Sequence, residues 1–215
     1  MTMKMISEFN IGNIVGTKST DDNSDVQNEL LSNNIEHIYQ WANIPARYKN
    51  AEFKAINKDQ EKLISTLRVT FQGKRFNDIQ DVLIYGSVGT GKTHISIAML
   101  HRLINANIYC RYTTQHHLLE LYFQKKYEDF EGFKKVSILI IDELGKTNLV
   151  DWQKVQLEEL ISYRYNEMLP TIYITNMELN EFKTFVGDRV TSRLRENKVV
   201  RILMDGKDLR GDLNE

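Results

Sequence analysis

The sequence has very little cysteine and proline: one cysteine, Cys110, and two prolines in 215 residues. A single cysteine cannot form a disulfide within the chain, and it cannot build a zinc site that needs paired cysteines, so we expect no zinc. Apolar runs are also short, because none approaches the ~18 residues that span a bilayer. The first residues are too polar for the apolar core of a signal peptide. We therefore expect a protein of the reducing cytoplasm with no membrane partner.

An excess of charge of one sign is lacking as well. Lys and Arg number 28 against 29 Asp and Glu, which gives a formal net charge of −1. No global field therefore indicates a nucleic acid or an acidic membrane, and any such binding must be local. A hydrophobic content of 41% and a charged content of 27% are typical of a globular chain with one main core.

The N-terminal part of the chain has the hydrophobic periodicity of helices. Apolar residues recur at spacings of three and four from Asp22 to Asn43, which predicts an amphipathic helix that ends before Pro45. A second helical pattern follows Asn57, the candidate N-cap. We divide the chain into a short helical N-terminal arm, residues 1–43, and a main domain, residues 44–215.

Beyond residue 80, short runs rich in β-branched residues alternate with longer helical patterns. Five strands are predicted, at Val82–Tyr85, Ile108–Thr113, Val136–Asp142, Thr171–Thr175 and Val199–Met204. Strands that alternate with helices form βαβ crossovers, which require a parallel sheet. The predicted fold is therefore α/β, a five-stranded parallel sheet flanked by helices.

One loop carries a specific phosphate-binding pattern. The motif G-x-x-x-x-G-K-[ST] is matched by Gly86, Ser87, Val88, Gly89, Thr90, Gly91, Lys92 and Thr93. It follows a predicted strand and opens a predicted helix, which is the context that a P-loop requires. Backbone N–H groups and the helix N-terminus would hold the phosphates, and Lys92 would reach the β- and γ-phosphates. We expect a nucleoside triphosphate here, with ATP the leading candidate.

Two adjacent acids follow the third predicted strand. Asp142 would emerge at the carboxyl end of the sheet, where it can hold Mg²⁺ together with the Thr93 hydroxyl. Glu143 would point to the other side and activate a water for attack on the γ-phosphate. A carboxylate beside the metal ligand favours hydrolysis over phosphoryl transfer to a small acceptor, so a P-loop kinase ranks last.

Five segments in order carry a family resemblance: Ile44–Phe53, Gly86–His94, Leu139–Gly145, Ile161–Tyr165 and Pro170–Asn176. Together they resemble the DnaC-type bacterial helicase loaders, a branch of the AAA+ ATPases that includes the IstB-type transposition helpers. The resemblance implies an AAA+ P-loop NTPase fold without a C-terminal lid. It also places His94 in the nucleotide-binding segment.

The same resemblance implies roles for three residues near the C-terminus. Asn176 matches the sensor-1 position that helps to hold the attacking water, although an Asn that opens a turn is an equally natural interpretation of the sequence alone. Arg193 matches the arginine finger that completes a neighbouring subunit's site, with Arg189 as the second candidate; the alternative is a solvated helix face. Arg210 lies at the sensor-2 position.

The implied partners are a replicative DnaB-type hexameric helicase, single-stranded DNA and further copies of this chain, joined through the arginine finger. Aromatics interleave with lysines in Leu121–Tyr127, a combination that can stack on bases and neutralise phosphates, or can equally be core and solvated faces of one helix. Tyr39 and Trp41 on the arm are candidate helicase contacts, against internal packing.

Three functions remain open from the sequence. The leading hypothesis is an ATPase that loads the replicative helicase onto single-stranded DNA, slowly and under stimulation by its partner. The second is an IstB-type transposition helper that acts on duplex DNA. The third is a nucleotide-gated adaptor that binds ATP and scarcely hydrolyses it.

Overall fold

The structure is a computed structural model, and it describes residues 37–71, 78–106 and 108–210. A five-stranded sheet forms its centre, with all neighbouring strands parallel. The strands are β1 (Val82–Tyr85), β2 (Cys110–Thr114), β3 (Ile138–Leu144), β4 (Thr171–Thr175) and β5 (Val200–Leu203). The predicted five-stranded parallel α/β fold is confirmed. Their order across the sheet is β2-β3-β4-β1-β5.

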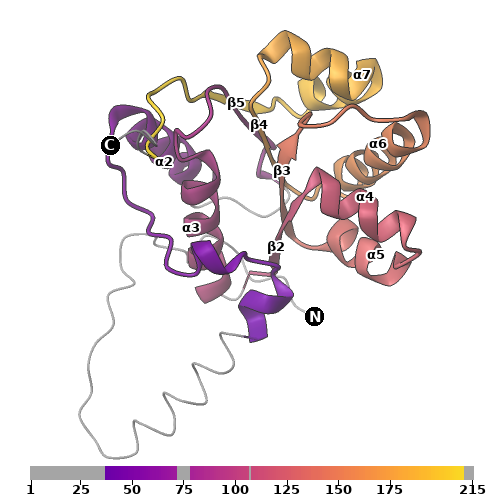
Figure 1. Ribbon diagram of the computed structural model, residues 1–215, viewed down its shortest axis with the longest axis horizontal. Coiled ribbons are helices and arrows are strands. Elements are labelled where there is room, and N and C mark those ends of the chain that lie inside the picture. The colour runs from indigo at the N-terminus through magenta and orange to yellow at the C-terminus, as the bar shows by residue number, and fades with distance from the viewer. Residues whose placement is uncertain (1–36, 72–77, 107, 211–215) are drawn as a thin grey trace, which may run out of the picture.

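Helices cover both faces of this sheet (Figure 1). One face is covered by α2 (Lys58–Phe71) and α3 (Lys92–Asn105), the other by α4 (Gln115–Phe123), α5 (Tyr127–Lys135), α6 (Asp151–Asn166) and α7 (Leu179–Glu196). Each face has its own apolar core: Leu67, Ile84 and Leu100 pack on the first, and Leu83, Leu139 and Leu160 on the second. Alternate residues of one strand thus serve opposite cores, as expected for a doubly covered sheet.

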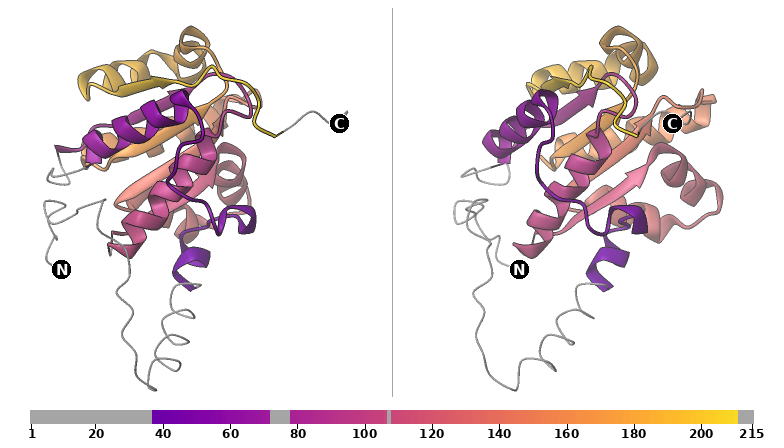
Figure 2. Two further views of the ribbon diagram at one scale, coloured as in Figure 1. Left: turned by 90° about the vertical axis from the view of Figure 1, so that its left-hand side faces the viewer. Right: turned by 60° about the vertical axis from the view of Figure 1, so that its left-hand side comes forward.

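The strand order creates a switch point at β1. The chain leaves β1 through α3 toward β2 at one edge, whereas β4 leads through α7 to β5 at the other edge (Figure 2). In open α/β sheets, ligands bind at the carboxyl ends of the strands beside such a point. The P-loop after β1 and the two acids at the end of β3 lie at that end of the sheet.

The predicted arm helix is only partly visible, since its residues 22–36 lie outside the described residues. Residues 37–41 are helical, and the chain then runs along the edge of the sheet. The Tyr112 N–H donates to the Ala42 carbonyl (2.8 Å), and the Asn43 side chain donates to the Tyr112 carbonyl (3.0 Å). These bonds satisfy backbone groups on the otherwise open side of β2.

The two aromatics of the arm behave differently. Tyr39 stacks on His101 of α3, with ring centroids 4.7 Å apart, so it packs within the molecule. Trp41 remains 45% exposed, in edge contact with Tyr109. The division of the chain at residue 43 stays a prediction. A short 3₁₀ helix, η2 (Ala46–Tyr48), then leads toward α2, whose Gln60 N–H is capped by the Asn57 side chain as expected (2.9 Å).

Six predicted strand ends were wrong by one or two residues. β2 begins at Cys110 rather than Ile108, and β3 runs to Leu144 because a bulge after Ile141 lets pairing resume with β4. The aromatic and basic segment Leu121–Tyr127 is not one helix. α4 ends at Phe123, Lys125 adopts a positive φ of 60°, and α5 begins at Tyr127. No helix among the described residues is long and apolar enough to cross a membrane.

A buried polar cluster ties the opposite end of the sheet together. Arg164 of α6 is 0% exposed, and its guanidinium donates to the carbonyls of Val136 (2.7 Å) and Pro170 (2.8 Å) and to the Thr171 hydroxyl (2.8 Å). Asp81 accepts from the Thr171 N–H (2.8 Å). Burial raises the pKa of Asp81 to about 6, against the smaller opposing effects of its hydrogen bonds and Arg164.

Because the pKa of Asp81 is higher in the folded chain, stability from this group is present at low pH and is lost as pH rises through about 6. We expect the free energy of unfolding of the natural protein to gain about 1 kcal/mol from Asp81 between pH 7 and pH 5. Asp81→Asn removes this titration and keeps an acceptor for Thr171. Urea unfolding at pH 5, 6 and 7 measures the difference.

Glu159→Gln, at an exposed position of α6, is the matched control and should keep the natural pH dependence. An Asp81→Asn variant that retains the full gain at low pH would show that Asp81 is already ionised at pH 5.

Candidate nucleotide-binding site

The P-loop between β1 and α3 is shaped by glycines with positive φ. Gly86, Gly89 and Gly91 have φ values of 113°, 77° and 92°, a region that side chains disfavour. Space is limited as well, because a Cβ on Gly86 would lie 2.5 Å from the Met204 carbonyl oxygen. The loop can therefore turn its backbone N–H groups toward one centre, as phosphate binding requires.

Lys92 is the first residue of α3 and is 5% exposed. Its ammonium group donates to the carbonyls of Gly86 (2.7 Å) and Ser87 (2.6 Å), so it is held against the loop. Burial lowers its pKa to about 8, with Asp142 opposing this effect and Arg210 adding to it. A lysine desolvated in this way gains from any negative phosphate placed beside it.

Thr93 and Asp142 meet although they follow different strands. The Thr93 hydroxyl donates to Asp142 Oδ2 at 2.7 Å, and the Tyr112 hydroxyl donates to the same oxygen at 3.0 Å. The Glu143 N–H donates to Asp142 Oδ1 at 2.7 Å. Burial raises the pKa of Asp142, and these three hydrogen bonds oppose the shift. A hydroxyl and a carboxylate at this separation fit the oxygen ligands of Mg²⁺.

Glu143 lies at a strained point of the backbone. Its φ is 55°, and the pairing of β3 with β4 shifts register between Ile141 and Leu144. The following turn is fixed by two bonds, from the Gly145 N–H to Gln115 (2.8 Å) and from the Thr175 hydroxyl to the Leu144 carbonyl (2.7 Å). A left-handed non-glycine residue beside a ligand site is a common functional feature. The Glu143 carboxylate pairs with Lys146 at 2.8 Å.

A cavity of about 600 Å³ lies over these groups, large enough for a nucleotide. Of the predicted site residues it is lined by Gly89, Thr90, Gly91, Lys92, Thr93, His94, Asp142, Glu143, Asn176 and Arg210. Gly86, Ser87 and Val88 belong to the loop and do not line the cavity. The geometry thus brings together the predicted phosphate, metal and sensor residues of one chain.

Residues 204–210 follow β5 without a helix and return to the P-loop. The Leu209 N–H donates to the Gly89 carbonyl (3.0 Å), and the Ser87 hydroxyl donates to Asp205 (2.5 Å). Arg210 is thereby carried to the cavity, where its Nε lies 3.5 Å from an oxygen of Asp208. An extended tail therefore brings Arg210, the predicted sensor-2 arginine, to the cavity.

Arg193 and Arg189 lie elsewhere. Both are on the last turns of α7, and neither lines the cavity of its own chain. Arg193 is half-buried, with its guanidinium 6.0 Å from the Tyr165 ring centre and a bond to the Arg189 carbonyl (3.3 Å). Arg189 pairs with Glu158 of α6 at 2.7 Å.

Two residues of the site were missed by sequence reasoning. Tyr112 was counted as a strand residue, yet its hydroxyl binds Asp142. Gln60 of α2 is 3% exposed, and its side-chain amide donates to the Thr90 carbonyl at 3.2 Å, which braces the loop from outside. Neither residue carries a local motif. Only the register of β2 against β3, and the packing of α2 on α3, reveals them.

Comparison with curated proteins finds relatives of two kinds. An insertion sequence IS5376 putative ATP-binding protein of Geobacillus stearothermophilus is 30% identical over 61% of this chain and 53% of its own length. The replicative helicase loader DnaC of Escherichia coli is 22% identical over 79% of this chain and 73% of its own length. The chain spans about half the length of the first curated relatives it matches, 44% and 53%.

Among solved structures, the fold is that of the crystal structure of the DnaC helicase loader. The TM-score is 0.67 at 24% identity, over 75% of this chain and 100% of that one. The two chains thus share one fold. A family model described as IstB-like ATP binding protein matches residues 30–200. Because that match covers most of the chain, the protein belongs to the family of IstB-like ATP-binding proteins.

Proposed function

We propose that this protein is an ATPase that loads a replicative DnaB-type hexameric helicase onto single-stranded DNA. The observation that carries the ATPase is the contact of Thr93 with Asp142 beside Glu143, at the mouth of one cavity. The loader role is supported by the similarity to DnaC, which extends over 79% of this chain. Membership of an ATP-binding family is compatible with both the ATPase activity and the loader role.

The residues divide the chemistry of hydrolysis among themselves. Backbone N–H groups of the P-loop and the Lys92 ammonium hold the phosphates, while Thr93 and Asp142 hold Mg²⁺, which neutralises charge on the phosphate oxygens when bound. Glu143 orients a water and accepts its proton, and Asn176 positions that water from the end of β4. Arg210 is close enough to the cavity to respond to the γ-phosphate.

Glu143→Gln keeps the shape of the side chain and removes the base. We expect ATP turnover to fall by roughly 10²-fold or more, since general-base catalysis contributes about that much, while ATP binding remains. Steady-state ATPase rates and a fluorescent-nucleotide titration measure the two effects. Lys92→Ala should lose binding itself.

Lys146→Ala serves as the control, because it removes the ion pair of Glu143 and leaves the carboxylate in place. Turnover that is the same in the natural protein and in Glu143→Gln would instead favour the nucleotide-gated adaptor.

A shared site between subunits is supported by the position of Arg193. Its guanidinium lies outside the cavity of its own chain, on a helix whose outer surface is open to a neighbour. We propose that Arg193 stabilises transition-state charge on the nucleotide of the next copy, so that the active unit is an oligomer.

Mixing two inactive variants tests this arrangement. Arg193→Ala and Lys92→Ala should each lose most ATPase activity, but assemblies of both contain sites with an intact P-loop and a neighbour's intact Arg193. We expect the mixture to recover a measurable fraction of the natural rate, in a manner that depends on total protein concentration. Two variants that stay inactive at every ratio, while still assembling, would contradict a finger supplied by a neighbour.

Single-stranded DNA binding is supported by an aromatic surface on α4 and α6. Phe123 is 75% exposed and Trp152 is 40% exposed, and their rings are stacked with centroids 6.5 Å apart. The lysines at 125 and 126 follow directly, both exposed. Exposed aromatics beside lysines suit the stacking of bases along a single strand.

The loader function predicts an ATP-dependent complex with the replicative helicase of the same host and faster helicase loading on single-stranded circular DNA. Phe123→Ala combined with Trp152→Ala should lower the affinity for single-stranded DNA by roughly 10-fold or more, since each stacked base contributes ~1–3 kcal/mol. The helicase complex should persist, because the arm is the proposed helicase contact. Fluorescence anisotropy and a pull-down measure the two.

Tyr109→Ala is the control, since Tyr109 is an aromatic residue with 56% exposure on another surface. Absence of any helicase complex under all nucleotide conditions would refute the loader. ATP-dependent assembly on duplex DNA would then favour the second candidate, the transposition helper, which the 30% identity to the insertion-sequence protein supports.

A further inference from the structure

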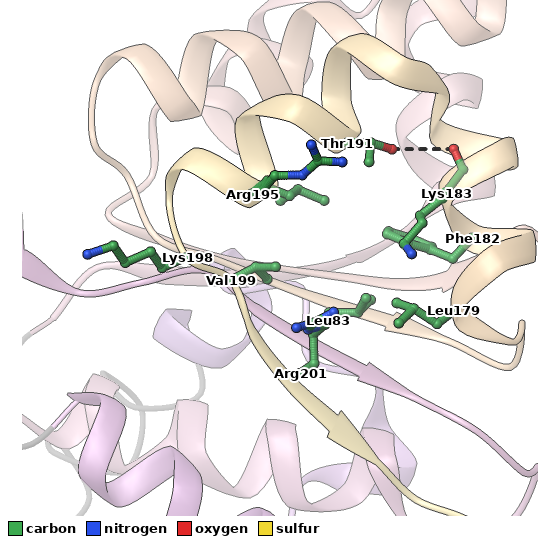
Figure 3. A pocket seen from close by; sticks show the side chains of 10 residues that line it. Leu83, Leu179, Phe182, Lys183, Thr191, Arg195, Lys198, Val199 and Arg201 are labelled. Atoms are coloured by element: carbon green, nitrogen blue, oxygen red, sulfur yellow. Dashed lines mark hydrogen bonds between the residues drawn. The ribbon is translucent and has the colours of Figure 1, made fainter.

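A second cavity, of about 320 Å³, lies between α7 and the edge strand β5, away from the nucleotide site (Figure 3). Its charged rim comes from three places: Lys183 and Arg195 on α7, Lys198 in the following turn, and Arg201 on β5. Among the residues that the structure describes, its lining includes no acidic one. We call these four residues and the surface between them the basic pocket.

The four cations of the basic pocket lack counter-charges. All four side chains are exposed, and none of them forms an ion pair with any residue that the structure describes. Lys183 has only a long contact with Asn180 (3.4 Å). By contrast Arg189, on the same helix, is paired with Glu158. In a chain with a net charge of −1, such a concentration of cations indicates an anionic occupant.

The floor of the basic pocket is aliphatic. Leu83, Leu179 and Val199 lie between the cations in Figure 3, and the buried ring of Phe182 lies beside Lys183 and Leu179. α7 bends at Gly187, which has φ 81° and ψ 169°, and the Thr191 hydroxyl donates to the Lys183 carbonyl across the bend (3.4 Å). The occupant should therefore combine negative charges with apolar side chains.

Such a segment exists in this chain. Residues 21–36, DDNSDVQNELLSNNIE, contain five acidic residues and no basic one, with Val26, Leu30, Leu31 and Ile35 among them. They lie outside the described residues and directly precede the helix at 37–41. We propose that the basic pocket is the docking site for this acidic segment of the same chain.

The tether is long enough to cross the sheet. The lateral separation from β2, where the arm joins the sheet, to β5 is four strand spacings, about 19 Å. The twelve peptide units that join Asp25 to His37 can span up to ~40 Å. Joining two partners by a short linker raises their effective concentration to about the millimolar range, so a weak contact suffices.

Single-stranded DNA suits the basic pocket less well. Phe182, the one aromatic residue in the described part of its lining, is 2% exposed and offers no free ring face to a base. The exposed aromatic pair that does offer such faces, Phe123 and Trp152, belongs to α4 and α6. An amphipathic acidic peptide uses both the cations and the aliphatic floor.

Carbodiimide coupling of the full-length protein tests the docking directly, because this reagent joins a carboxylate to an amine only in contact. We expect peptide mapping by mass spectrometry to find acids of residues 21–36 joined to Lys183 or Lys198 at least fivefold more often than to Lys62 or Lys154, which are exposed elsewhere. The coupling should fall at 0.5 M salt, where charges are screened within ~4 Å. Equal coupling to all four lysines overturns the proposal.

Variants separate the remaining outcomes. Arg195→Glu with Arg201→Glu should reduce coupling to Lys183 and Lys198 at least fivefold, whereas Lys62→Glu with Lys154→Glu makes the same change in net charge and should leave it unaltered. Circular dichroism melts test whether both variants fold. If Arg195→Glu with Arg201→Glu does not fold, the coupling pattern of the unaltered protein alone decides the proposal.

Two results would assign the pocket to another occupant and overturn the proposal. In a mixture of ¹⁴N and ¹⁵N protein, coupling found mainly between light and heavy chains would identify the segment of a second copy. Coupling unchanged in Arg195→Glu with Arg201→Glu, together with a fall in affinity for single-stranded DNA, would identify a nucleic-acid surface. Neither result depends on whether the protein loads a helicase.

Discussion

The hydrogen bond from Thr93 to Asp142, 2.7 Å long, is the contact on which the nucleotide site depends. Thr93 belongs to the loop and helix that follow β1, and Asp142 lies near the carboxyl end of β3, yet β4 lies between these two strands. The contact therefore forms only when all three central strands are in register. Tyr112, reaching from β2 to the same carboxylate, extends this requirement to a fourth strand. The contact between Thr93 and Asp142 therefore depends on the complete sheet.

The nucleotide site thus depends on strand register. This explains why the polar groups at the opposite end of the sheet are also buried and paired. Arg164 holds the starts of β3 and β4 through their carbonyls, and Asp81 holds β4 beside β1 through Thr171. A shift of one residue between parallel strands would turn side chains to the other face and separate Thr93 from Asp142. The buried polar cluster at one end of the sheet thus fixes the geometry of the site at the other end.

The sequence alone was sufficient to predict those features that depend on consecutive residues. The P-loop, the two acids at the end of the third apolar run and the identity of all five strands could be predicted because each depends on a local pattern of glycines, charges or apolar runs. Tyr112 and Gln60 could not, since their roles arise from strand register and helix packing between distant parts of the chain. The bulge that gives Glu143 its positive φ, and the break between α4 and α5 at Lys125, were hidden for a related reason. Both depend on which neighbour the backbone pairs with.

The net charge near zero gave no information about local binding surfaces, because it is the sum over an acidic region and a basic region. Residues 21–36 contain five acids and no base. Around β5 and α7 stand four cations that form no ion pair among the described residues, at the other edge of the sheet from the point where the arm attaches. Both edges of a parallel sheet present backbone groups that need cover, and here β2 is covered by Ala42 and Asn43. An arm that covers one edge with its backbone and reaches the other with its charges would link both edges of the domain.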